Sequence, residues 1–155
     1  MDWKLTQVGV LPNRMTLREG VQAIGAQRLG RAAEALQLGL LQSLPPRPAG
    51  DPIIRVFPAW PNNWDATFRL LARRGFLVTS SMQGGRIRFV EIHSQLGEVC
   101  RLRNPWPGAP VDLYRDGQRS GTLKGSLLEV PTRTGETIWL LPAGVRPEQV
   151  RVRVP

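Results

Sequence analysis

The sequence predicts a mainly β protein: an antiparallel β-sandwich of about eight short strands, preceded by an N-terminal helical segment. Before residue 51, apolar residues recur every three or four positions, which is the spacing of a helix with one apolar face. After residue 51, short apolar-rich stretches are separated by glycine, proline, asparagine and aspartate at short, regular spacing. The 155 residues suit one domain, or one small domain with an appendage. We therefore expect a helical segment and linker over residues 1–50 and the sandwich over residues 51–155.

The predicted helix begins at Thr16, which stands in capping-box spacing with Glu19. Its apolar stripe continues to Leu40 and shifts phase near Gly25, where we expect a bend or a break. The proline-rich stretch PPRPAG at residues 45–50 ends the helix and is the clearest linker in the chain.

An aromatic segment follows the linker, with four aromatic residues in the twelve positions from Phe57 to Phe68. Its two prolines fix φ and remove backbone donors, so the chain must leave any sheet that it enters here. Each large aromatic side chain can bury about 150–250 Å² and hold an irregular segment in place. We therefore predict a packed connection between helix and sheet, with these structural anchors: Phe57, Pro58, Trp60, Pro61 and Trp64.

The predicted strands are bounded by turn signals. Gln83-Gly84-Gly85 and Asp116-Gly117 supply the positive-φ residues of hairpin turns. At the C-terminus, valines alternate with arginines on the period of a half-buried strand. The strands expected from these signals cover residues 76–82, 86–93, 98–103, 111–115, 120–123, 127–130, 137–141 and 150–154.

Four dispersed motifs agree in order and spacing with one enzyme family. They are LLQS at residues 40–43, IRVFPAWP at 54–61, LARRGF at 71–76 and EIHS at 91–94. Together they resemble the C-terminal region of glycoside hydrolase family 95 and related α-L-fucosidase-like enzymes, over roughly residues 35–141. The resemblance implies a non-catalytic C-terminal β-sandwich that supports the catalytic barrel. Residues 1–50 would be the remnant of the barrel end, and the missing barrel domain would be the partner.

Catalytic residues are not expected in this chain. Glycoside hydrolysis normally needs two carboxyl groups about 5 Å or 6.5–9.5 Å apart. Asp112 and Glu129 could be neighbours across a sheet, but no pattern places them in a cleft. The resemblance implies that the catalytic groups lie in an upstream (α/α)6 barrel. The family's Asp-Gly-Asn-Phe-Gly segment corresponds here to residues 24–30, IGAQRLG, without an aspartate.

Metal and cofactor sites are not expected either. His93 is the single histidine, which excludes a site with two histidine ligands, and it suits a surface or packing position. Cys100 is the single cysteine, so no internal disulfide can form, and we expect a small buried side chain.

An autonomous carbohydrate-binding module is the alternative interpretation, because exposed tryptophans stack on sugar rings and sandwiches commonly carry sugar sites. Trp106, in the loop Asn104-Pro105-Trp106-Pro107-Gly108, is the side chain we expect to be most exposed. Trp139 is expected to pack within the sandwich. The candidate carbohydrate-contacting residues are Trp106, Trp60 and Trp64.

The formal net charge of +9 makes a nucleic-acid-binding protein the second alternative. The basic residues are mostly arginines scattered along the chain, without a run of five and without interleaved aromatics. We therefore expect solvated surface charge and no nucleic-acid partner. The sequence has no run of 18 apolar residues and its first residues lack signal-peptide features, so we expect no membrane span and leave the compartment open.

Overall fold

The computed structural model describes residues 21–150, and side chains from Gly30 onward. The chain divides into two units, residues up to 36 and residues from 37 on, and every described strand lies in the second unit. The elements are α1 (Val21–Leu40), β1 (Leu41–Leu44), β2 (Ile53–Val56), β3 (Ala66–Ala72), β4 (Phe76–Gln83), β5 (Arg86–Ser94), β6 (Val99–Arg103), β7 (Val111–Arg115), β8 (Gln118–Leu123), β9 (Leu127–Pro131), β10 (Thr137–Pro142) and the 3₁₀ helix η1 (Pro147–Gln149).

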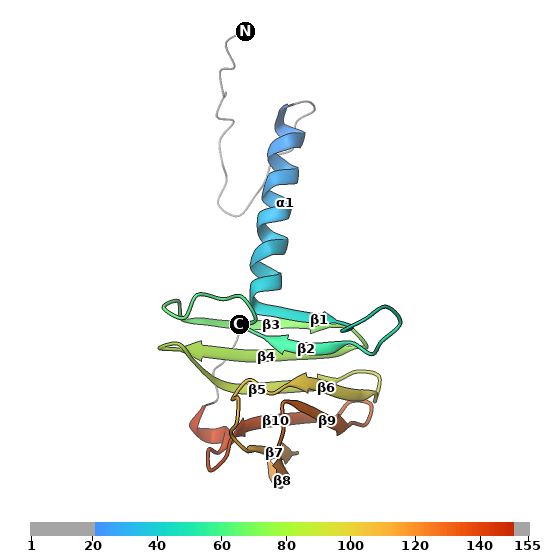
Figure 1. Ribbon diagram of the computed structural model, residues 1–155, viewed down its shortest axis with the longest axis vertical. Helices are drawn as coiled ribbons and strands as arrows, with labels where there is room; N and C mark the ends of the chain where they lie inside the picture. The colour runs from blue at the N-terminus through green and yellow to red at the C-terminus, as the bar shows by residue number, and fades with distance from the viewer. Residues whose placement is uncertain (1–20, 151–155) are drawn as a thin grey trace. The chain divides into compact units, whose positions relative to one another are not determined.

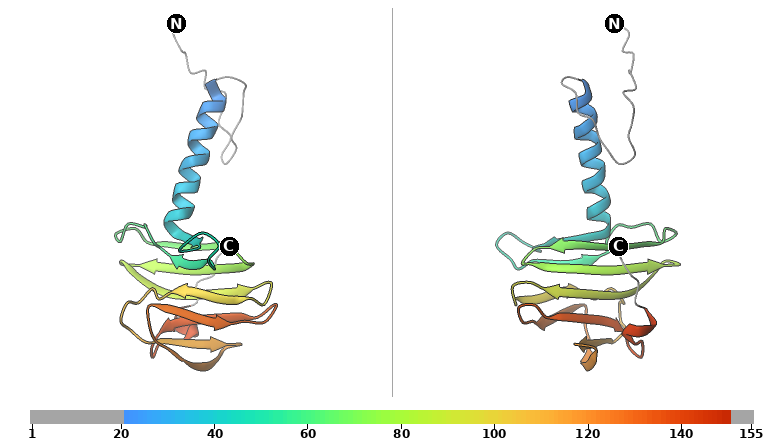
Figure 2. Two further views of the ribbon diagram at one scale, coloured as in Figure 1. Left: turned by 45° about the vertical axis from the view of Figure 1, so that its right-hand side comes forward. Right: turned by 180° about the vertical axis from the view of Figure 1, so that it is seen from behind.

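The predicted fold class is confirmed, with ten strands in the described residues where about eight were expected. A four-stranded sheet has the order β1-β2-β6-β9, and a six-stranded sheet has the order β3-β4-β5-β10-β7-β8. All pairings are antiparallel except the parallel contact of β2 with β6. The strands of both sheets run alongside one another, as in an aligned sandwich (Figure 1, Figure 2).

One apolar core fills the space between the sheets. The four-stranded sheet contributes Ile54 and Leu102, and the six-stranded sheet contributes Val78, Val90 and Leu140, all at most 2% exposed. Alternate residues of a strand point to opposite faces, so these positions turn one face of each sheet inward. This shared core is what holds the loops at either end of the sandwich in fixed positions.

A second apolar cluster covers part of the outer face of the six-stranded sheet. Phe89 and Trp139 stack there with ring centroids 5.1 Å apart, beside Tyr114, Leu141 and Val150. The Tyr114 hydroxyl donates to the carbonyl of Val145 at 3.3 Å, which holds the segment after β10 against the cluster. Trp139 is buried, as expected. Val150 lies in a turn after η1, and the remaining residues of the predicted strand 150–154 lie outside the described part of the chain.

The end of the helix differs from the prediction. Helix α1 ends at Leu40, and Leu41–Leu44 is a strand paired with β2, although the helical segment was expected to run to the proline-rich stretch. The cause lies in the aromatic segment: Phe57 N–H donates to the carbonyl of Leu40 at 2.6 Å, and Ala59 N–H to that of Gly39 at 3.4 Å. These contacts satisfy carbonyls that a helix end leaves without partners. The predicted linker at residues 45–50 is therefore part of a hairpin loop within the sandwich. Thr16, the expected helix start, lies outside the described residues.

Strand β3 was missed by the strand prediction. Its residues Phe68 and Ala72 are buried while Thr67, Arg69 and Leu71 are exposed, so the period of two is present. The run of adjacent apolar residues at its end hides that alternation in the sequence.

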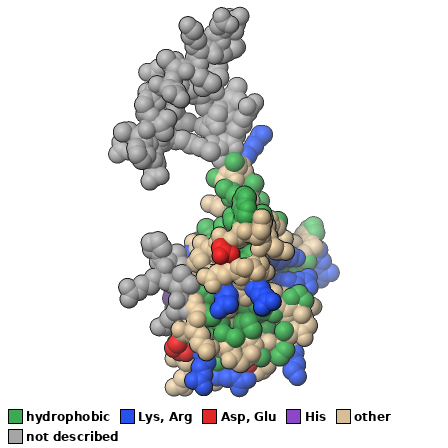
Figure 3. Space-filling view, turned by 90° about the vertical axis from the view of Figure 1, so that its left-hand side faces the viewer, with side chains coloured by type: hydrophobic (Ala, Val, Ile, Leu, Met, Phe, Trp, Pro, Cys, Tyr) green, Lys and Arg blue, Asp and Glu red, His purple; other side chains and the backbone are tan. Residues whose placement is uncertain are grey.

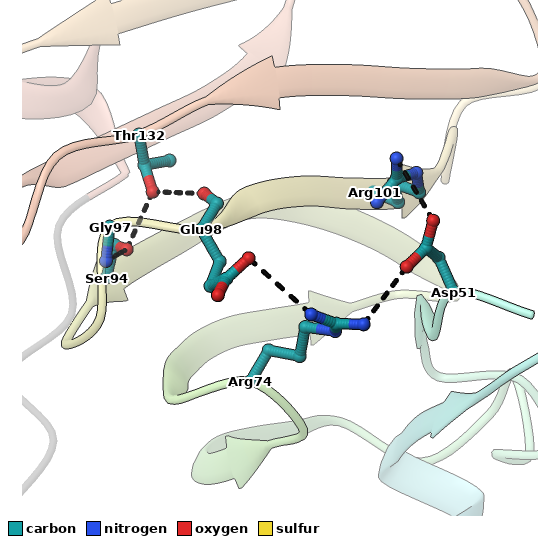
Figure 4. A network of polar contacts seen from close by, with 7 residues as sticks. All are labelled: Asp51, Arg74, Ser94, Gly97, Glu98, Arg101 and Thr132. Carbon is teal, nitrogen blue, oxygen red and sulfur yellow. Dashed lines mark hydrogen bonds and ion pairs between the residues drawn. The ribbon is translucent and has the colours of Figure 1, made fainter.

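A network of ion pairs links the two sheets near the ends of their strands (Figure 4). Arg74, in the turn between β3 and β4, contacts Asp51 before β2 at 3.1 Å and Glu98 before β6 at 3.6 Å. Arg101 of β6 contacts the other oxygen of Asp51 at 3.2 Å. These side chains are partly exposed, so each pair contributes little to stability. The ion pairs connect residues that are far apart in the sequence.

Candidate functional site

Phe57 is the buried start of the aromatic segment. Its side chain is 7% exposed and meets the ring of Phe68 edge-on, with centroids 5.1 Å apart. Its backbone has a φ of +51°, a conformation that side chains other than glycine adopt rarely. The segment therefore turns sharply at Phe57, between the sheet and the capped end of α1.

Trp60 and Trp64 contact each other within the segment. Trp60 is half-buried against the core, and its Nε1–H donates to the carbonyl of Trp64 at 3.0 Å. The rings meet edge-on with centroids 5.9 Å apart. Trp64 is 54% exposed, and Pro58 and Pro61 are exposed as well. Of the five predicted anchors, Phe57 is buried and Trp60 is half-buried, whereas Pro58, Pro61 and Trp64 are exposed. Trp64 contributes to the contact through its backbone carbonyl.

The far end of the segment lies against the turn between β4 and β5. The Asp65 carboxylate accepts the N–H of Gly84 at 2.8 Å. Gly85 has a φ of +71°, and a Cβ there would lie 3.0 Å from the carbonyl oxygen of Asn62, a tight contact that places the turn directly against the segment. The turn and the aromatic segment therefore form one continuous wall.

Trp106 is half-buried, so the expectation that it would be the most exposed tryptophan is wrong. The amide of Asn104 fixes its loop, donating to the carbonyls of Ala109 at 3.2 Å and Gly125 at 2.9 Å and accepting Trp106 N–H at 2.9 Å. The loop thereby turns the indole onto β5, where Nε1–H donates to the carbonyl of Ile87 at 2.9 Å. The ring packs on the core instead of extending into solvent.

A cleft of about 740 Å³ lies between these loops, and we call it the Trp106 cleft. Its size falls within the range of ligand sites. Figure 3 looks onto this end of the sandwich, where β4 turns into β5, and apolar side chains gather there beside basic ones. No residue that lines the cleft is acidic. The apolar side chains that form most of the wall are Phe57, Met82, Ile87, Pro105, Trp106 and Pro107.

Two arginines, Arg86 and Arg88, complete the lining of the Trp106 cleft. Both side chains are exposed, and neither makes an ion pair with any residue in the described part of the chain. The register of β5 against β4 shifts here, because Ile87 pairs with Met82 while Phe89 pairs with Ser81. Arg88 is the extra residue of this β-bulge, a feature that commonly redirects a side chain. Neither arginine was predicted as a site residue.

The carboxylates of Asp112, Glu129 and Glu136 make contacts within the sandwich. Asp112 and Glu129, suggested as possible neighbours across a sheet, lie on different sheets, in β7 and β9. Glu129 accepts a hydrogen bond from Arg101 at 2.8 Å. Burial opposes ionisation of Glu136, but hydrogen bonds from the Arg115 side chain and from Arg133 N–H outweigh it and lower its pKa. Because each of these three carboxylates is bonded to an arginine, they do not form two free carboxyl groups that face a common cleft.

Asp112 is the most strongly perturbed of these acids. The hydrogen bond from Arg119, at 2.8 Å, is the main cause that lowers its pKa from 3.8 to about 2, against the opposing effect of burial. Thr122 Oγ1–H and Gly144 N–H donate to the same carboxylate at 2.7 and 3.0 Å. Asp112 thereby connects β7, β8 and the turn after β10.

Replacing Asp112 with asparagine is expected to lower the free energy of unfolding by about 2 kcal/mol near neutral pH, because charge-assisted hydrogen bonds are lost. A depressed folded pKa means that the ionised carboxylate stabilises the fold above about pH 4, and this contribution disappears as the pH falls toward about 2. Urea unfolding at both ends of that range measures the change. Asp116→Asn, at an exposed turn position, is the matched control. An equal loss for Asp112→Asn at both ends of the range would contradict the assignment.

The described residues contain no candidate metal site and no ionised thiol. Residues 21–150 contain no group of three or more histidine, cysteine, aspartate or glutamate side chains placed to hold a metal ion. Cys100 is fully buried, as expected, and burial raises its pKa to about 12, so the thiol stays protonated. His93 is half-buried and its Nδ1 lies 3.0 Å from the hydroxyl of Thr137. Within the described residues, α1 lacks the long apolar stretch that a membrane-crossing helix requires.

Comparisons with known proteins add no family assignment: no family model matches the sequence, and no curated protein matches it significantly.

Proposed function

We propose that this chain is a non-catalytic C-terminal β-sandwich of a fucosidase-like glycoside hydrolase, and that it supports a catalytic helical barrel. The proposal depends most on the surface of α1. Every residue from 30 to 38 is exposed, including Leu36 at 53% and Leu38 at 41%. The resemblance to family 95 supplies a partner for this helix, since residues 36–40 of α1 belong to the stretch that corresponds to the last barrel helix.

The physical reason is that helices in proteins gain most of their stability from packing one face against a neighbour. An exposed apolar stripe without such a neighbour is unfavourable. Leu36 and Leu38 lie about 200° apart around the helix axis, so barrel helices on both sides of α1 would bury them. Phe57 and Ala59 of the sandwich unit donate to the last carbonyls of α1, so the end of the helix is bonded to the segment that precedes β3.

The sandwich unit itself also exposes apolar side chains on β1 and β3, two of its four edge strands. Leu44 of β1 is 43% exposed and Leu71 of β3 is 63% exposed. The strands are held near each other because Arg73 N–H donates to the Ser43 hydroxyl at 2.9 Å. Trp64, 54% exposed, precedes β3. These side chains provide further apolar surface for a partner domain.

The chain alone is expected to release no nitrophenol from nitrophenyl α-L-fucoside. The reason is that Asp112, Glu129 and Glu136 are engaged with arginines, and that the catalytic residues implied by the resemblance lie outside this chain. A sensitive absorbance assay on the purified chain checks this. Turnover that disappears on replacing one of these carboxylates by its amide would overturn the non-catalytic assignment.

Binding to a barrel tests the proposal itself. A family 95 barrel that lacks its own C-terminal domain is expected to melt at a higher temperature when this chain is added, because a ligand that binds only the folded state stabilises it. Leu36→Glu should abolish the shift, since it places a charge in the apolar contact. Gln37→Glu, at the next exposed helix position, introduces the same charge as the control. An unchanged melting temperature with the wild-type chain would contradict the proposal.

The exposed ring of Trp64 favours a carbohydrate-binding module as the second candidate function. Its edge-on contact with Trp60 holds the ring in place while more than half of its surface remains accessible. A glycan array probed with the wild-type chain and with Trp64→Ala tests this candidate. A glycan bound by the wild type and lost in the variant would favour sugar binding over barrel support.

A further inference from the structure

We propose that the Trp106 cleft is a docking site for an acidic polypeptide segment, which places an apolar side chain in the cleft and its carboxylates on Arg86 and Arg88. This inference concerns a surface separate from the exposed face of α1, and it stands whether or not the partner there is a barrel. It follows from three features of the cleft: its apolar wall, two arginines that make no ion pair within residues 21–150, and the fixed positions of its loops.

The wall favours an apolar side chain over a sugar. Phe57, Met82 and Ile87 line it together with three prolines and the indole of Trp106. The single donor of that indole is already engaged with the carbonyl of Ile87, so it is not free for a ligand. Asn62 is the one neutral amide side chain in the lining. A sugar has many hydroxyls that need partners, and hydroxyls left without partners reduce affinity.

The charges favour an acidic occupant. Arg74, Arg101, Arg115 and Arg119 each contact a carboxylate within the sandwich, whereas Arg86 and Arg88 contact none in the described part of the chain. Because the lining contains no acidic residue, nothing in the cleft offsets these two positive charges. A guanidinium group binds a carboxylate through two parallel hydrogen bonds, which adds geometric selectivity to charge attraction.

The loops around the cleft are fixed before any partner arrives. The carboxylate of Asp65 holds the β4–β5 turn, and the amide of Asn104 holds the Trp106 loop from both sides. Arg86 and Arg88 both line the cleft from β5, and the β-bulge lies at Arg88. A site that is already formed loses less conformational entropy on binding, so even a short segment can be recognised.

Selection from a phage-displayed library of random dodecapeptides identifies the chemistry without choosing a sequence in advance. The wild-type chain is the target, and the double variant Arg86→Gln/Arg88→Gln removes library members that bind elsewhere. The enriched peptides are expected to carry two or more acidic residues beside a large apolar one. The best peptide is then synthesised with a fluorescent label, together with a copy in which glutamines replace its acidic residues.

Fluorescence polarisation measures three comparisons. The double variant should bind the acidic peptide about fivefold or more weakly than the wild type, and the wild type should bind the glutamine copy correspondingly weakly. Arg47→Gln/Arg69→Gln removes the same charge at exposed positions outside the cleft and should bind as the wild type does. Amide shifts in a ¹⁵N-labelled chain should map to Ile87, Trp106 and their neighbours.

Several results would overturn the proposal. They are the enrichment of peptides without acidic residues, equal affinity for the acidic peptide and its glutamine copy, or an equal loss in both double variants. The same holds if no peptide is enriched, or if the amide shifts lie away from the cleft. A labelled oligogalacturonate or single-stranded DNA that binds the cleft more tightly than the best peptide would replace the polypeptide with an acidic saccharide or a nucleic acid.

Discussion

Replacing Phe57 with alanine is expected to lower the free energy of unfolding by about 3–5 kcal/mol, the range found for buried aromatic side chains. The loss has two sources: a cavity beside Phe68, and the removal of the ring from one wall of the Trp106 cleft. The positive φ of the position is as unfavourable for alanine as for phenylalanine, so backbone strain is not relieved. Urea unfolding followed by tryptophan fluorescence measures the change.

Asn63→Ala is the control for Phe57→Ala, because Asn63 is exposed in the same segment. It should change the free energy of unfolding by less than about 0.5 kcal/mol. If the two substitutions had equally small effects, the aromatic segment would not be anchored by Phe57, and the capping of α1 by this segment would lose its structural basis.

Replacing Trp106 with alanine is expected to lower the free energy of unfolding by about 3 kcal/mol, although the sequence suggested an exposed ring. The indole packs on the core, and its loss also leaves the carbonyl of Ile87 without its donor. Trp106→Phe separates these contributions, because it keeps an aromatic ring and removes the N–H. It should cost about 1 kcal/mol, the usual contribution of one hydrogen bond.

A negligible effect of Trp106→Ala, with an equally small effect of Trp106→Phe, would show that the ring is accessible in solution. The surface around Trp106 would then be a better candidate for sugar stacking, and the binding-module interpretation would gain over barrel support.

The sequence predicted those strands that are bounded by strong turn signals. The hairpin of β4 and β5 has Gly84 and Gly85 at its turn, both with positive φ, and that of β7 and β8 has Asp116 and Gly117. Strand β1 was not predicted because Leu41–Leu44 follows α1 directly, with no turn signal between helix and strand. Its pairing with β2 depends on contacts between Leu40 and Phe57, which are far apart in the sequence. Local patterns carry no information on such contacts.

The candidate site was predicted less well than the fold. The aromatic segment stands out in the sequence, but the Trp106 cleft is built from several distant segments that only the sheet register brings together. Arg88, which lines the cleft, lies at a β-bulge. The alternation of residues along β5 in the sequence gives no sign of that bulge. The orientation of Trp106 depends on the amide of Asn104, whose partners Ala109 and Gly125 lie in two different loops. An Asn-Pro pair in the sequence indicates a turn, but not the direction in which the next side chain points.

Sedimentation velocity of this chain mixed with a family 95 catalytic barrel that lacks its C-terminal domain tests barrel support most directly. The account predicts one faster-sedimenting complex containing one copy of each, and Leu36→Glu should dissociate it whereas Gln37→Glu should not. Two separate boundaries at all concentrations for the wild-type chain, with the barrel shown to be folded by circular dichroism, would contradict the proposed function.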